Sequence, residues 1–108
     1  RDLDYVDDVT EALLLAAASA EAEGQVFNLG HPEAISLLDL AQLLIQLHGR
    51  GGYRLIPFPP DRKRIDIGDY QGDYGQIKAL LGWEPRISLA EGLTRTLRYY
   101  QQHWRHYW

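Results

Sequence analysis

The sequence contains no cysteine and no methionine among its 108 residues. Without cysteine the chain can form no disulfide, no thiolate nucleophile and no Cys-ligated zinc or iron–sulfur site. No hydrophobic run approaches the roughly 20 residues that a membrane-spanning helix needs. Positive charge is not in excess, since the net charge is −4, so neither a membrane nor a nucleic acid is an expected partner. The missing methionine predicts that the chain is a piece of a longer one.

The composition predicts one folded domain over residues 1–108. Hydrophobic residues make up 45% of the chain and charged residues 24%, an ordinary balance for a globular protein. A chain of this length can bury roughly 65% of its unfolded surface. One segment stands out, because residues 9–20 form a helix so rich in Ala and Leu that most of its sides should be covered.

The pattern of the chain predicts alternating strands and helices, in the order β-α-β-α-β-α-α. Helix starts are marked by the capping boxes Ser36/Asp39 and Ser88/Glu91, and helix ends by Gly49 and Gly82. The predicted helices cover residues 9–20, 36–48, 73–81 and 88 onward, and the predicted strands cover residues 2–6, 25–30 and 53–58.

A charged loop over residues 61–72 is the one stretch without the pattern of a helix or strand, and function concentrates in such loops. It carries the cluster Arg62, Lys63 and Arg64, with Asp66 two residues on. Guanidinium groups suit a diphosphate and a nearby carboxylate suits sugar hydroxyls. The alternative is a solvated charged loop balanced by its own aspartates.

Two other patterns are weaker. Tyr74 and Lys78 spell Tyr-x-x-x-Lys, in which a lysine one helical turn away lowers the phenol pKa. With seven tyrosines, a short helix and no preceding Gly-rich phosphate loop, we interpret this match as chance. His103 and His106 are three residues apart and could hold a metal, but no carboxylate lies nearby in the sequence to complete the site. Metal binding is therefore an alternative interpretation only.

Five segments in register carry a resemblance to a known family. The chain resembles the NAD(P)-dependent nucleotide-sugar epimerases and dehydratases, the extended short-chain dehydrogenase/reductases. The matching segments are RDLDYVDD at residues 1–8, VFNLG at 26–30, SLLDLA at 36–41, LLGWEP at 80–85 after Asp73, and SLAEGL at 88–93.

The resemblance implies an α/β fold of which this chain is the small C-terminal substrate-binding subdomain, made of helices with a few short strands. The Rossmann half, with its NAD or NADP and its true Tyr-x-x-x-Lys pair, would lie before Arg1. The implied enzyme is cytoplasmic and acts on UDP-, dTDP- or GDP-sugars. The chain alone would bind no cofactor, contain no catalytic residue and be inactive.

The resemblance also implies the substrate-binding residues. Arg1 corresponds to an arginine that contacts the diphosphate, and Asp66 to an aspartate that binds hydroxyls. The second diphosphate contact falls on Arg62, Lys63 or Arg64. The apolar helix 9–20 would pack against the Rossmann half or, without it, mediate self-association. The alternative is a non-catalytic module for nucleotide-sugar binding or assembly.

Overall fold

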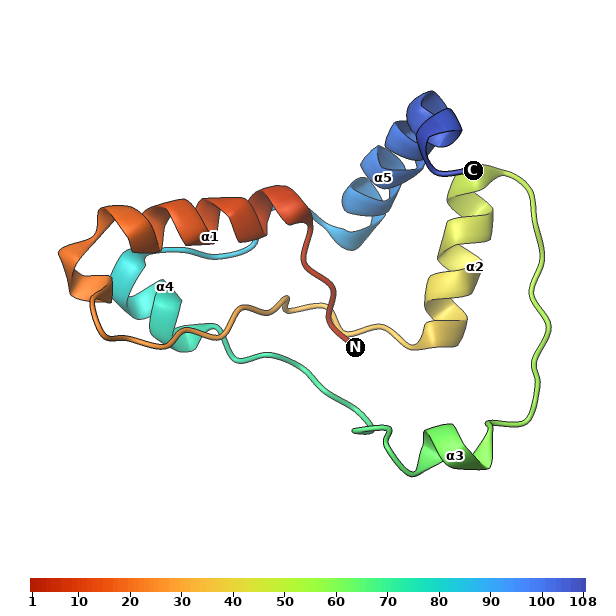
Figure 1. Cartoon of the computed structure of the whole chain (residues 1–108), viewed down its shortest axis with the longest axis horizontal. Helices are drawn as coiled ribbons and strands as arrows, with labels where there is room; N and C mark the ends of the chain where they lie inside the picture. Colours follow the sequence, from red (N-terminus) through yellow and green to blue (C-terminus); the bar gives the residue numbers. More distant parts are fainter.

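The computed structural model describes all 108 residues, and the chain is made almost entirely of helices and loops (Figure 1). None of the helices combines the length and the apolar character that crossing a bilayer requires. The elements are α1 (Val6–Ala18), the 3-10 turn η1 (Ala20–Ala22), α2 (Leu37–His48), α3 (Pro60–Lys63), α4 (Gly75–Leu81), α5 (Leu89–His103) and the 3-10 turn η2 (Trp104–His106).

The longer helices form two pairs at opposite ends of the molecule (Figure 1). Helix α1 lies beside α4, where Ala12 packs with Ile77 and Trp83 in the hydrophobic core. Helix α2 packs against α5. The short helix α3 lies on a long loop away from both pairs.

The predicted starts of α2 and α5 are confirmed by their capping bonds. The Ser36 hydroxyl accepts from the Asp39 N–H at 3.0 Å and the Ser88 hydroxyl from the Glu91 N–H at 3.4 Å. Helices α2 and α4 end at Gly49 and Gly82, whose φ angles of 77° and 70° favour glycine. Local sequence determines these boundaries.

Helix α1 begins three residues before its predicted start. Asp7 and Asp8 lie in its first turn and not at the N-cap, which is Tyr5. Carboxylates in a first turn interact favourably with the helix dipole. The helix gains one turn at its start and ends at Ala18, because Ser19 caps the 3-10 turn that follows.

The three predicted strands are wrong. The backbone makes one isolated antiparallel bridge, between Asp2 and Ala34, flanked by the Ile35 N–H bonded to the Arg1 carbonyl at 2.8 Å. Residues 25–30 and 53–58 form no strand, because no neighbouring segment pairs with their backbone groups. Leu55 and Ile56 are 74% and 64% exposed, so their apolar character does not mark a buried strand.

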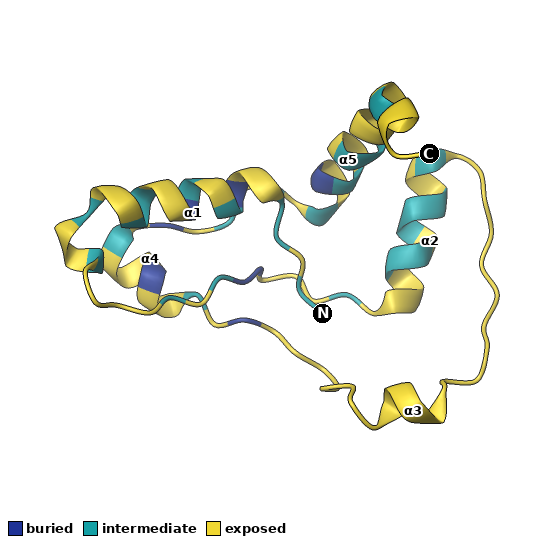
Figure 2. Cartoon of the chain, in the orientation of Figure 1, coloured by how far each residue is buried: buried dark blue, intermediate teal, exposed yellow.

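The predicted charged loop 61–72 contains a helix that the sequence pattern did not indicate. Helix α3 starts with Pro60, which suits a first helical position because its φ is fixed and it needs no N–H partner. Asp61 in the first turn and Lys63 in the last turn both complement the helix dipole. The helix is one turn long and fully exposed (Figure 2).

The chain buries little of its surface for its length. Only eight of its 108 residues are buried, and three of these form the hydrophobic core. Its radius of gyration is 16.9 Å, against about 13 Å for a compact chain of this length. Its accessible surface is 8458 Å², against about 6,100 Å² expected for a compact monomer of this mass. Much apolar surface is therefore left open.

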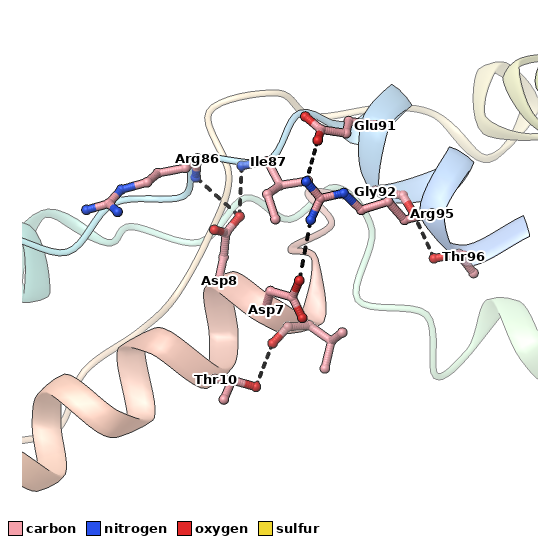
Figure 3. A network of polar contacts seen from close by, with 10 residues as sticks. Asp7, Asp8, Thr10, Arg86, Ile87, Glu91, Gly92, Arg95 and Thr96 are labelled. Carbon is pink, nitrogen blue, oxygen red and sulfur yellow. Dashed lines mark hydrogen bonds and ion pairs between the residues drawn. The ribbon is translucent and has the colours of Figure 1, made fainter. Parts of the chain in front are cut away.

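Asp8 connects α1 to the segment between α4 and α5. Its side chain is buried, and Oδ2 accepts from the backbone N–H groups of Ile87 at 3.0 Å and Arg86 at 3.2 Å (Figure 3). Its backbone carbonyl accepts from the indole N–H of Trp83 at 2.9 Å. One residue thereby positions both the largest core side chain and the entrance to α5.

Replacing Asp8 tests this connection, with Asp7 as its matched control. We expect Asp8→Ala to lower the free energy of unfolding by about 2 kcal/mol, because two loop N–H groups lose their acceptor. Asp7 is exposed and pairs only with Arg95 at 3.4 Å, so Asp7→Ala should cost less than about 1 kcal/mol. Urea unfolding of the two variants measures the difference, and equal losses would contradict it.

Candidate functional site

The first two residues hold together loops that are far apart in the sequence. The Asp2 Oδ2 accepts from the Gly72 N–H at 2.8 Å and from the His31 N–H at 3.2 Å. Burial disfavours the charged form of Asp2, but these backbone hydrogen bonds outweigh it and hold the pKa of the carboxyl below its usual value. Asp2 therefore joins residues 30–31 and 72 to the start of the chain.

Gly30 and Gly72 allow this approach because neither has a side chain. A Cβ atom on Gly30 would lie 2.4 Å from the Gly72 carbonyl oxygen, and a Cβ atom on Gly72 would lie 2.3 Å from the Leu29 carbonyl oxygen. Gly30 ends the segment predicted as a strand, and the structure uses it for close contact between two backbones. These contacts place residue 72 beside the N-terminal segment.

Arg1 lies against the loop that follows α3. Its guanidinium donates to the Gly68 carbonyl, and Nη2 lies 3.8 Å from Asp66 Oδ1. The same Asp66 oxygen accepts from the Gly68 N–H at 2.7 Å, which closes a tight turn around Gly68 at φ 71°. Two predicted site residues that are 65 positions apart, Arg1 and Asp66, are thus brought together.

A cavity of about 430 Å³ lies at this contact, which is within the usual size of ligand pockets. Its charged groups are Arg1, Arg62 and Asp66. The rest of its wall is apolar and is formed by Leu37, Phe58, Pro59, Ile65 and Ile67. We call this the loop cavity. It combines two guanidinium groups, one carboxylate and an apolar wall.

The three cations of the predicted cluster have different positions. Arg62 lines the loop cavity, whereas Lys63 lines an adjacent cavity with Phe58, Asp66 and Gly68. Arg64 is the C-cap of α3 and lines neither of these two cavities. None of the three makes an ion pair. Arg62 is therefore the cation that the structure brings next to Arg1.

The apolar wall of the loop cavity was not predicted from the sequence. Phe58 belongs to the predicted strand 53–58, and Ile65 and Ile67 belong to the predicted charged loop 61–72. The structure leaves these side chains 54%, 72% and 71% exposed. Apolar residues directly flanking Asp66 were the available signal, because exposed apolar side chains beside charged groups are typical of a binding site.

Tyr74 and Lys78 both make structural contacts. The Tyr74 ring packs edge-on against Trp83 with 6.0 Å between ring centroids. Lys78 pairs with Glu84, and this hydrogen bond raises the pKa of the ammonium. Tyr74 is the N-cap of a seven-residue helix. The pair therefore has a role in packing that needs no catalytic interpretation.

His103 and His106 lie near each other, with 6.1 Å between ring centroids. The structure contains no group of three or more histidine or carboxylate side chains arranged to hold a metal. The His103 ring lies 4.5 Å from the Tyr99 ring, measured between centroids. The metal alternative gains no third ligand from the fold.

Comparison with known proteins was made by sequence and by structure. No protein-family model matches the chain. It is 35% identical to UDP-glucuronic acid decarboxylase 1 of Xenopus tropicalis, over 98% of this chain and 24% of that protein. It is 33% identical to dTDP-glucose 4,6-dehydratase of an Actinoplanes strain, over 94% of this chain and 31% of that protein.

A solved structure agrees with these sequence matches. The crystal structure of UDP-glucose 4-epimerase from Thermotoga maritima, with UDP-glucose, matches with a TM-score of 0.78 and 34% identity, over 96% of this chain and 32% of that one. The chain belongs to the nucleotide-sugar epimerase and dehydratase family. This confirms the predicted resemblance to the extended short-chain dehydrogenase/reductases.

The epimerase-family chain spans about a quarter to a third of the length of these relatives. Its mostly helical structure matches the C-terminal part of an epimerase-like fold. The predicted fold, the C-terminal subdomain of an extended short-chain dehydrogenase/reductase, is therefore confirmed.

The carboxyls of Asp2 and Asp4 make the stability of the fold change with pH in opposite directions. The folded-state pKa of Asp2 lies below its ordinary value of 3.8, so its contribution to stability is present above that pH and is lost as the pH falls. Burial and the charge of Asp2 raise the pKa of Asp4, whose Oδ1 has no hydrogen-bond partner. Ionised Asp4 therefore destabilises the fold above that pH.

Asparagine at either position removes the titration with little change of shape. At pH 7 we expect Asp2→Asn to unfold more easily, and Asp4→Asn less easily, than the unchanged chain. Both differences should shrink at pH 3, because this pH lies below the ordinary carboxyl pKa of 3.8. Urea unfolding at the two pH values measures them, and a change of the same sign in both variants would contradict the assignment.

Proposed function

We propose that the chain is the nucleotide-sugar-binding part of an NAD(P)-dependent epimerase or dehydratase, and that the loop cavity holds the nucleotide sugar. The observation that carries this proposal is the meeting of Arg1, Arg62 and Asp66 around one cavity of about 430 Å³. The relatives support the proposal, because their names refer to UDP- and dTDP-linked sugars.

The charges of the loop cavity suit a diphosphate. Arg1 and Arg62 each present a guanidinium fork, which forms paired hydrogen bonds with phosphate oxygens. Arg1 faces Asp66 across 3.8 Å between half-exposed side chains, an interaction weak enough for a diphosphate to replace. Lys63 adds positive charge from the adjacent cavity.

Asp66 suits the hydroxyl-bearing part of the ligand. Its Oδ1 already accepts from the Gly68 N–H, which fixes the carboxylate in one orientation. Its Oδ2 makes no hydrogen bond within the chain and can accept from a sugar or ribose hydroxyl. The apolar wall around Phe58 provides the surface against which a ring can pack.

The residues of this chain do not form a binding site for the NAD(P) cofactor. A dinucleotide site needs a glycine-rich turn between a strand and a helix. The only glycine-rich stretch, Gly49–Gly52, follows α2 and leads into a loop without a strand. We therefore assign NAD(P), the acid/base pair and the hydride transfer to a further domain of the full-length protein, so that this chain alone is inactive.

The open apolar surface suits contact with that domain. Leu13 and Leu14 on α1 are 65% and 66% exposed. The whole chain exposes about 2,300 Å² more surface, polar and apolar together, than a compact monomer of its mass, whereas each partner buries roughly 800 Å² in a standard interface. We propose that the dinucleotide-binding domain covers this surface, and that the isolated chain self-associates through α1 when that domain is absent.

Calorimetric titration with UDP-glucose tests the loop cavity, with UDP, dTDP and GDP in parallel to identify the base. Arg62→Ala and Asp66→Ala should each weaken binding about tenfold or more, since each removes charge-assisted hydrogen bonds. The matched control is Arg64→Ala, which removes the same charge two residues away and should change the Kd less than about twofold. Equal losses in the Arg62 and Arg64 variants, or full affinity in the Asp66 variant, would contradict the proposal.

A further inference from the structure

The last twelve residues, 97–108, differ from the rest of this acidic chain. They include two arginines, two histidines and five tyrosines or tryptophans, and no acidic side chain. The loop cavity is lined by none of these residues. The segment forms the end of α5, the turn η2 and the two residues after it.

A second cavity of about 580 Å³ lies between this segment and the end of α2. We call it the C-terminal cleft, and its size is within the range of small-molecule sites. Its lining residues come from the α2 end and from the C-terminal segment, and none is acidic; they are His48, Arg50, Leu97, Tyr100, Gln101, Trp104 and Trp108. It shares no residue with the loop cavity.

Neighbouring side chains position the aromatic rings of the cleft. The Arg105 guanidinium lies over the Trp104 ring, 5.6 Å from its centroid. Tyr100 packs against Trp108 with 6.0 Å between ring centroids, and against Tyr107 at 5.0 Å. Trp104 and Trp108 are nevertheless 52% and 81% exposed. Rings that are positioned and yet open can stack on a flat ligand.

The cation of the cleft is oriented and lacks an anionic partner. The Arg50 Nε–H donates to His48 Nε2 at 3.1 Å, and Gln101 Nε2 lies 3.5 Å from His48 Nδ1. These contacts hold the guanidinium at the cleft, while its two terminal nitrogens make no hydrogen bond or ion pair within the chain. A guanidinium in this state is suited to binding an anion through two parallel hydrogen bonds.

We propose that the C-terminal cleft is a second ligand site, which binds a small molecule that combines a flat ring with an anionic group. The ring stacks on Trp104 or Trp108, and the anion is bound by the terminal nitrogens of Arg50. A phosphate and a carboxylate fit this chemistry equally, so both are probed.

The three tryptophans of the chain allow a direct test by NMR of their indole N–H signals. Trp104 and Trp108 line the cleft, whereas Trp83 is buried in the core and reports whether the fold is intact. The probes are adenosine 5′-monophosphate for phosphate, indole-3-acetate for carboxylate, and adenosine as the ring without charge. At least one anion should shift the signals of Trp104 and Trp108 saturably and leave that of Trp83 in place.

Variants identify the cation and separate the two sites. Arg50→Gln should weaken binding about tenfold or more, whereas Arg54→Gln, a matched change at an exposed arginine outside both cavities, should have less than a twofold effect. The shifts should persist in Arg62→Ala, which disables only the loop cavity. Binding of one anion and not the other supports the proposal and identifies the anionic group.

Four outcomes would overturn the proposal. The first is that neither anion shifts the two cleft signals, and the second is that adenosine binds as tightly as its monophosphate. The third is that Arg50→Gln and Arg54→Gln have the same effect while the Trp83 signal shows an intact fold. Loss of the shifts in Arg62→Ala would assign the binding to the loop cavity and overturn it as well.

Discussion

The bonds made by Asp8 are the interaction on which the arrangement of the helices depends. Its carboxylate accepts from two loop N–H groups, and its backbone carbonyl accepts from the indole of Trp83. The core of this chain has only three buried hydrophobic residues, so packing alone gives little orientation to the helices. A buried carboxylate with fixed hydrogen-bond partners orients the helices, which such a small core cannot do by packing alone.

Asp2 does the same for the loops around the loop cavity. Like Asp8, it uses one carboxylate oxygen to bind two backbone N–H groups from distant parts of the chain. Because Arg1 precedes it directly, the contact that closes the loops also places a guanidinium at the cavity. The first eight residues therefore contribute both to stability and to the charge of the site.

The sequence predicted what depends on local interactions. The caps at Ser36 and Ser88 and the glycine ends of two helices are properties of four or five consecutive residues. The strand predicted at residues 53–58 does not form. A strand needs a neighbouring strand to pair with, and local sequence does not reveal whether one is present. Among the candidate site residues, only the family resemblance indicated that Arg1 and Asp66 belong to one site. The choice of Arg62 over Arg64 needed helix α3, whose single turn was not predicted.

The central claim is that Arg1, Arg62 and Asp66 form one site for a nucleotide sugar. A crystal structure of the protein with UDP-glucose tests it most directly. We expect the diphosphate between the guanidinium groups of Arg1 and Arg62, and a ligand hydroxyl within hydrogen-bonding distance of the Asp66 carboxylate. A diphosphate bound away from both arginines, with the loop cavity empty, would contradict it.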